Sequence, residues 1–140
     1  MTLEEFRRIH SELIEQYQFI EHHLEGIYSC LCEDKSFYDG LLEVEKDTIH
    51  RLLDRIRAKQ NESGMILLAD AELEKIEGIC SRRNFWCHNC YVDLVFDYKT
   101  GGPKRPIDIE QMLQDLAEAN EIRGELFKKK ESLLRNKRWL

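Results

Sequence analysis

The chain has 140 residues, of which 42% are hydrophobic and 34% are charged, and its formal net charge is -6. This length fits one domain over residues 1–140, and because neither an export signal nor an apolar run of roughly 18 residues is visible, we expect a cytoplasmic protein outside membranes. The acidic balance argues against a broad nucleic-acid surface, since phosphate affinity depends mainly on clustered Lys and Arg.

Two interlaced sets of apolar or amphipathic residues, each spaced by seven, occupy the first part of the chain. Their members, called the seam below, are Phe6, His10, Leu13, Tyr17, Ile20, Leu24, Ile27 and Leu31. This spacing predicts one long helix that packs against an antiparallel neighbour or a partner subunit. A homodimer that buries the seam is therefore expected.

Two shorter helices are predicted next. After a break at residues 33–40, helical spacing of apolar residues predicts a second helix from about Leu41 to Gln60, and Gly64 follows as a stop signal. Asp70 is the expected N-cap of a short third helix. Both helices have apolar residues at the spacing that lines one side, as a bundle requires.

The segment after the third helix decides where functional side chains would lie. Residues 81–84 are interpreted as a joint, with Asn84 as the N-cap of a fourth helix that fades near Tyr98. If one helix instead continues unbroken, Arg83 and His88 lie roughly 140° apart around its axis, and they cannot easily cooperate.

The rest of the chain predicts a loop and a last long helix. Residues 92–96 fit the fourth helix better than a strand, because their apolar residues do not alternate. A loop is expected at residues 101–103, and Asp108 is the expected cap of the last helix, whose basic run at 128–130 should face solvent. The predicted fold is an all-α helical bundle of four to five helices.

The run Arg83-Asn84-Phe85-Trp86-Cys87-His88 carries the candidate chemistry. Unpaired N–H groups at a helix start favour a phosphate, and Arg83 would add a bidentate clamp. His88 can change protonation near neutral pH and so move the proton of an RNA 2′-hydroxyl. This chemistry needs no metal and no cofactor, so we expect neither.

The surroundings of this run are locally basic. Between residues 80 and 105 five cationic side chains stand against two acidic ones, in an otherwise acidic chain. We therefore expect RNA phosphates to be contacted by Arg82 and by the loop residues Lys99, Lys104 and Arg105.

The spacing Arg83-Asn84-x-x-x-His88 resembles the Arg-Asn-x-x-x-His form of the signature of HEPN domains, the "higher eukaryotes and prokaryotes nucleotide-binding" superfamily. The predicted helix order is also similar over most of the chain. The resemblance implies a HEPN-like helical bundle and, as in many members, a metal-independent endoribonuclease of a toxin–antitoxin or defence system that works as a dimer. It further implies Arg83 and His88 as catalytic residues, Asn84 as a supporting polar group, and an antitoxin protein as a partner.

Two further features follow from the resemblance. Family members often add a carboxylate from an earlier helix, and Glu43, Asp47 and Asp54 are the candidates here. One subfamily has a tyrosine two residues past the histidine, which a partner nucleotidyltransferase modifies. This chain has Cys90 at that place, so that partnership is not expected.

Two other interpretations stay open. The bundle would instead be a non-catalytic module that binds a protein or a nucleotide, with Arg83 as a solvated charge and His88 bonded to a carbonyl. The cysteines of the chain, odd in number and expected to be reduced, also include a Cys-x-x-Cys at 87–90 and a Cys-x-Cys at 30–32. These four thiols suit zinc, although free Cys is common in helical cores.

Overall fold

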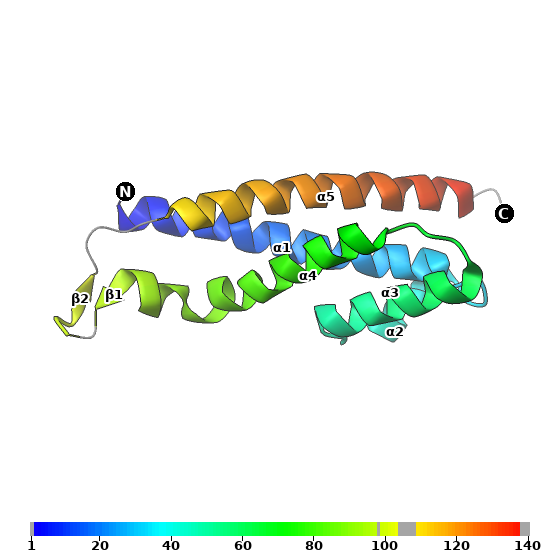
Figure 1. Cartoon of the computed structure of the whole chain (residues 1–140), viewed down its shortest axis with the longest axis horizontal. Helices are drawn as coiled ribbons and strands as arrows, with labels where there is room; N and C mark the ends of the chain where they lie inside the picture. The colour runs from blue at the N-terminus through cyan, green and yellow to red at the C-terminus, as the bar shows by residue number, and fades with distance from the viewer. Residues whose placement is uncertain (1, 98, 104–108, 138–140) are drawn as a thin grey trace.

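Two long helices run side by side along the molecule in this computed structural model, which describes residues 2–97, 99–103 and 109–137 (Figure 1). They are α1 (Leu3–Leu31) and α5 (Glu110–Lys137), and the other helices pack against this pair. The protein is an all-α helical bundle, which confirms the fold class predicted from the apolar periodicity.

Helix α1 begins with a capping box, and its seam is buried as predicted. The Thr2 hydroxyl accepts a hydrogen bond from the Glu5 amide at 3.1 Å, and the Glu5 carboxylate accepts one from the Thr2 amide at 2.9 Å. Every seam residue is buried except His10, which is half-buried. The heptad spacing therefore identifies the inner side of this helix correctly.

The seam packs against α5 of the same chain, and the two helices are parallel (Figure 1). Arg123 contacts Gln16 and Lys130 contacts His23, so both helices advance by seven residues in the same direction. The predicted antiparallel neighbour is wrong, and no partner subunit is needed to cover the seam.

The region predicted as one second helix forms two. Helix α2 (Phe37–Val44) ends before a turn, and helix α3 (Ile49–Ser63) begins where the Thr48 hydroxyl accepts a hydrogen bond from the Arg51 amide at 3.2 Å. The prediction of one helix over 41–60 is wrong, because this N-cap starts a new helix despite the regular apolar spacing around it.

The end of α3 and the start of α4 lie close to their predicted positions. Gly64 ends α3 in the left-handed conformation with φ 71°. Helix α4 (Asp70–Asn84) has Ala69 as its N-cap, so Asp70 is the first helical residue rather than the cap. Its negative charge there still favours the positive end of the helix dipole.

The chain does not restart a helix at Asn84. The Asn84 backbone is helical, with φ -58° and ψ -41°, and its side chain makes no capping hydrogen bond. Helix α4 instead runs directly into two π-helical turns, η1 (Phe85–Asn89) and η2 (Tyr91–Val95). The predicted joint at 81–84 is wrong, because no glycine or proline lies between residues 79 and 100 to break the helix.

A small hairpin follows η2 at one end of the molecule (Figure 1). Strand β1 (Phe96–Asp97) pairs antiparallel with β2 (Gly102–Pro103), and Gly101 turns the chain with φ 70°. The loop predicted at 101–103 therefore contains one of these short strands. Tyr98 and Asp108, which the sequence predicts near helix ends, lie outside the described residues.

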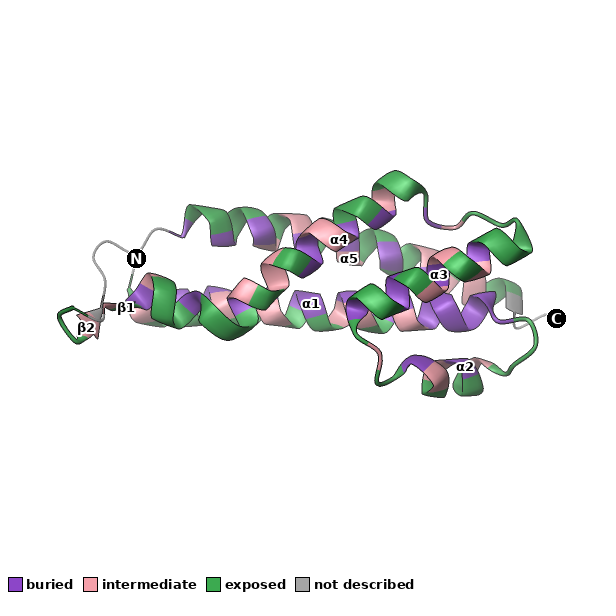
Figure 2. Cartoon of the chain, turned by 60° about the horizontal axis from the view of Figure 1, so that its bottom comes forward, coloured by how far each residue is buried: buried purple, intermediate pink, exposed green. Residues whose placement is uncertain are grey.

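Buried residues gather on the sides of the helices that face one another, whereas α2 is buried only at Gly40 and Val44 (Figure 2). Within the basic run 128–130, Lys130 is only 8% exposed and therefore buried. The prediction that the whole run faces solvent is wrong at this residue. In the described ranges, no helix combines the length and the apolar character needed to cross a membrane.

Candidate functional site

Arg83 lies in the last turn of α4 and pairs with a carboxylate of α1. Its Nη2 atom is 2.8 Å from Oε1 of Glu21, with 32% and 28% of the two side chains exposed. This ion pair fixes one edge of the guanidinium. The other N–H groups have no partner among the described residues, so they are available to a further acceptor.

His88 lies in η1, and its imidazole is exposed to solvent. Within the described part of the chain it makes no hydrogen bond and no ion pair. The neighbouring motif residue Asn84 is also exposed and is likewise not engaged in a cap. The two polar motif residues after Arg83 are therefore open to a ligand.

The π-helical winding changes how Arg83 and His88 are related. Residues five apart lie roughly 140° apart in an α-helix, whereas a turn closed by hydrogen bonds between residues five apart returns them to nearly the same side. The Cys90 amide donates to the Phe85 carbonyl, which is such a five-residue bond. Because only the interval from Phe85 onward is wound this way, the angle between Arg83 and His88 around the helix is smaller than about 140°, although the two residues still lie on different sides.

A histidine of α1 supports this winding. In an α-helix the Trp86 carbonyl would accept from the Cys90 amide, but here it accepts from His10 Nε2 at 2.7 Å and from Cys90 Sγ at 3.1 Å. The His10 ring therefore carries its proton on Nε2. It also packs against Phe6 and Tyr91, with ring centroids 6.0 and 5.0 Å away.

Glu21 and His10 are the site residues that the sequence did not reveal. His10 is recognisable only as a member of the seam. Glu21 lies four residues after Tyr17 and three before Leu24, so it flanks the seam in the manner of the charged positions beside a coiled-coil interface. That position was a usable signal for an interhelical ion pair, although it does not identify Arg83 as the partner.

Arg82 points away from Arg83 and toward α5. Its Nε is 2.7 Å from Oδ1 of Asp115, and its Nη2 is 2.6 Å from Oε2 of Glu118. Asp115 is 2% exposed and also accepts a hydrogen bond from Trp86 Nε1 at 2.7 Å. An RNA phosphate would have to compete with both carboxylates for Arg82, so the structure does not group it with Arg83 and His88.

The remaining residues predicted to contact RNA lie in or beyond the hairpin. Lys99 is exposed, and its backbone amide donates to Oδ1 of Asp97 at 2.9 Å. Lys104 and Arg105 lie outside the described residues. Their predicted contacts with RNA therefore stay predictions.

The three carboxylates proposed to assist the site pair elsewhere. Oε1 of Glu43 accepts from Arg55 Nη1 at 2.9 Å, and Lys35, which contacts its other oxygen, is the main cause of a lowered pKa for this carboxyl. Asp47 is 2.6 Å from Arg55 Nε, and Asp54 is exposed at the side of α3. The carboxylate that reaches Arg83 is Glu21 instead.

The cysteines do not assemble a metal site. All five are free, and Cys87 alone is exposed. Burial raises the pKa of the Cys87 thiol, and the nearby Arg83 partly opposes this shift. In the part of the chain that the structure describes, no three His, Cys, Asp or Glu side chains come together as metal ligands, so the four-cysteine zinc alternative is not supported.

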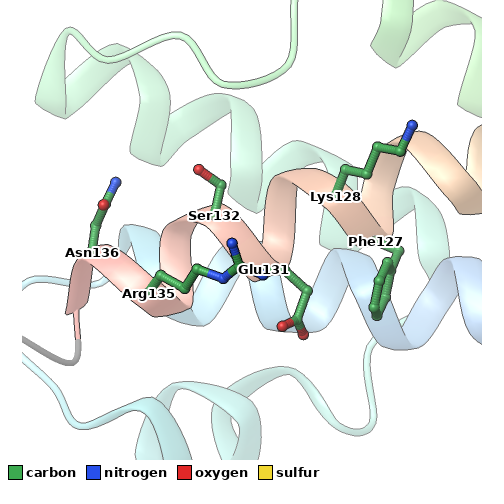
Figure 3. Close-up of a pocket in the computed structure, with 6 residues that line it drawn as sticks. All are labelled: Phe127, Lys128, Glu131, Ser132, Arg135 and Asn136. Carbon is green, nitrogen blue, oxygen red and sulfur yellow. The ribbon is translucent and has the colours of Figure 1, made fainter.

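Three cavities lined by described residues lie away from Arg83 and His88. One of about 500 Å³ lies between α1, η2 and the hairpin. Another, of about 400 Å³, follows one face of α5, and Figure 3 shows its six lining side chains spread along that helix. The third, of about 420 Å³, lies between α1 and α5.

The chain matches no family model, no curated protein and no solved structure.

Proposed function

We propose that this protein is a metal-independent endoribonuclease whose site contains Arg83 and His88. The observation that supports the proposal is that His88 and Asn84 are exposed and Arg83 is half-exposed, within one continuous helical segment whose π-helical winding from Phe85 onward narrows the angle between Arg83 and His88. Glu21 supports it by holding Arg83 in place. Asn84 is an exposed polar neighbour that can donate to or accept from the same substrate.

In the proposed reaction the RNA 2′-hydroxyl attacks the adjacent phosphodiester. His88 removes the hydroxyl proton and returns a proton to the leaving 5′-oxygen, while the free N–H groups of Arg83 stabilise the extra negative charge of the phosphorane. One P–O bond forms and one breaks, which leaves a 2′,3′-cyclic phosphate and a 5′-hydroxyl. No redox partner or metal takes part in these steps.

The proposal includes a homodimer, in which two such segments face one RNA, and an antitoxin protein that covers them. Because α5 covers the seam within one chain, the dimer now rests on the motif resemblance alone. Arg82 and Lys99 are the two described residues that were predicted to contact RNA. Of these, Lys99 is the exposed one and is therefore the more accessible to RNA.

Cleavage of single-stranded RNA in the presence of EDTA tests this function. We expect products with 2′,3′-cyclic phosphate ends, and we expect Arg83→Ala and His88→Ala each to slow cleavage by about 100-fold or more. His50→Ala is the matched control, because it removes an exposed imidazole from α3. Cleavage that both variants retain, or products with 3′-hydroxyl ends, would contradict the proposal.

One observation favours the second candidate, a non-catalytic interaction module. The ion pair of Arg83 with Glu21 bridges α4 and α1, as a purely structural contact would. In that case Arg83→Ala changes stability and the wild-type protein cleaves no RNA. If Arg83→Ala keeps its fold but loses the RNA cleavage of the wild type, the endoribonuclease is supported instead.

A further inference from the structure

The cavity of about 420 Å³ between α1 and α5 is lined by aromatic, polar and cationic side chains. It is lined by Phe19, His23, Asn120, Arg123, Gly124 and Phe127. Phe19 and Glu21 lie two residues apart on α1 and so point roughly 200° apart around the helix. This groove is therefore on a different side of α1 from the ion pair of Glu21 with Arg83, and it belongs to a different site.

Lys130 lies behind the groove as a buried cation. Its side chain is 8% exposed, and among the described residues its hydrogen-bond partner is His23 Nδ1 at 2.9 Å rather than a carboxylate. Gly26 makes room for its stem, since a Cβ there would lie 2.6 Å from Lys130 Cδ. A buried ammonium without a negative partner is unfavourable. An anion bound nearby would therefore stabilise the charged form of Lys130.

The contact with Lys130 determines the state of His23. An ammonium donates and never accepts, so Nδ1 of His23 must be the acceptor, and the neutral ring carries its proton on Nε2. Burial, followed by the charge of Lys130, lowers the pKa of His23 to about 4, which keeps the ring neutral at pH 7. His23 lines the groove, and Nε2–H is the donor that its neutral ring offers to a bound group.

Arg123 supplies a second charge that neutral groups hold in place. Its Cζ lies 3.9 Å from the centroid of the Phe19 ring, and its Nη1 donates to Oε1 of Gln16 at 3.0 Å. In the described structure it forms no ion pair, whereas Arg82 and Arg83 each meet a carboxylate. The guanidinium is thus oriented while its charge remains uncompensated.

The rim of the groove adds an aromatic surface. Phe127 is 48% exposed, and its ring centroid lies 5.6 Å from that of His23. Gly124 has no side chain, and a Cβ there would meet no atom within 4 Å, so the groove is open at this point. An anion that also carries a ring can place that ring against Phe127.

We propose that this groove binds a small oxyanion attached to an aromatic group, with its charged oxygens between Arg123 and His23 and its ring against Phe127. Lys130 supports the site through its charge. The proposal depends on other residues than the endoribonuclease site and stands or falls independently of it.

Calorimetric titration of the full chain with phenyl phosphate at pH 7 tests the site. We expect saturable binding by the wild type and about tenfold weaker binding by Arg123→Gln, which removes the charge and leaves a polar side chain. Lys130→Met keeps the apolar stem and removes the buried charge, with the same expected loss. Arg8→Gln is the matched control, because Arg8 is an exposed cation of α1 whose side chain is 66% exposed, and it should bind as the wild type does.

Three results would overturn the proposal. The first is the absence of saturable binding at millimolar phenyl phosphate. The second is equal binding of benzyl alcohol, which has the ring without the anion. The third is loss of binding in Arg83→Ala with full binding in Arg123→Gln, which would place the anion at the other site. Because Arg123 is half-exposed, its variant remains informative even if Lys130→Met fails to fold.

Discussion

Among single residues, Gly40 sets how closely α2 approaches α1. A Cβ atom at this position would lie 2.3 Å from Ser29 Oγ and 2.9 Å from Ser29 Cα, closer than packed atoms come. Gly40→Ala must therefore push the two helices apart. We expect it to lower the free energy of unfolding by about 1–3 kcal/mol, measured by urea unfolding and circular dichroism.

Gly124→Ala is the matched control for this substitution. The added Cβ meets no atom within 4 Å at that place in α5. Since alanine favours a helix over glycine, we expect unchanged stability or a gain of up to about 1 kcal/mol. An equal loss of stability in both variants would show that close approach is not what Gly40 provides.

Residue type and spacing identified Arg83 and His88 as candidates, but not what surrounds them. Arg82 and Arg83 are the same residue type side by side, yet neighbouring helical residues point about 100° apart, so one meets α5 and the other meets α1. Which of the two reaches Glu21 depends on how α4 crosses α1. No local sequence pattern encodes that crossing.

At the level of elements, the π-helical turns are the feature most open to test. His10→Phe keeps an aromatic ring in the stack with Phe6 and Tyr91 but removes the donor to the Trp86 carbonyl. We expect a loss of about 1–2 kcal/mol in stability and a shift of the segment toward α-helical winding. Hydrogen-bond couplings measured by NMR should then join the Cys90 amide to the Trp86 carbonyl instead of the Phe85 carbonyl.

His50→Phe is the control, since it makes the same change at an exposed position of α3. If the Arg83–His88 site is catalytic, His10→Phe should also slow RNA cleavage while His50→Phe does not. A Cys90 amide that still donates to the Phe85 carbonyl in the His10 variant would mean that the winding is set by other contacts.

The helices themselves were predictable to different degrees. The length of α1 followed from the seam, because a heptad pattern repeated over four turns or more is hard to produce by chance. The division between α2 and α3 was missed at Thr48, whose capping role competes with apolar spacing on both sides. The π-helical winding has no sequence signal of its own, because it depends on a carbonyl of η1 meeting His10 of α1.

For the molecule as a whole, the parallel arrangement of α1 and α5 could not be deduced from the chain. A seam of apolar residues fits a parallel or an antiparallel neighbour equally well. The direction is set by the return segment of α4, η1 and η2, which carries the chain back along α1 before α5 begins (Figure 1). That segment also holds the candidate site. The contacts that join it to α1, from Arg83 to Glu21 and from the Trp86 carbonyl to His10, therefore both position the segment and shape the site.

The α1–α5 interface makes stability depend on pH through His23. Burial and the charge of Lys130 lower the pKa of His23 from 6.5 to about 4. Between these two pH values His23 is therefore neutral in the folded protein and protonated in the unfolded chain. Below pH 6.5 the unfolded state therefore binds more protons, and stability falls as the pH is lowered toward 4. Between pH 6.5 and pH 5 we expect a loss of about 2 kcal/mol, measured by urea unfolding.

Replacing His23 by glutamine separates the pH dependence that His23 causes from general acid denaturation, because glutamine accepts a hydrogen bond but does not titrate. In His23→Gln the side-chain oxygen can still accept from Lys130, but it takes up no proton, so the loss between pH 6.5 and pH 5 should largely disappear. His22, whose pKa is also lowered by burial, leaves a smaller dependence of the same sign. Equal slopes in the wild type and His23→Gln would show that the buried contact of Lys130 with His23 does not couple this interface to pH.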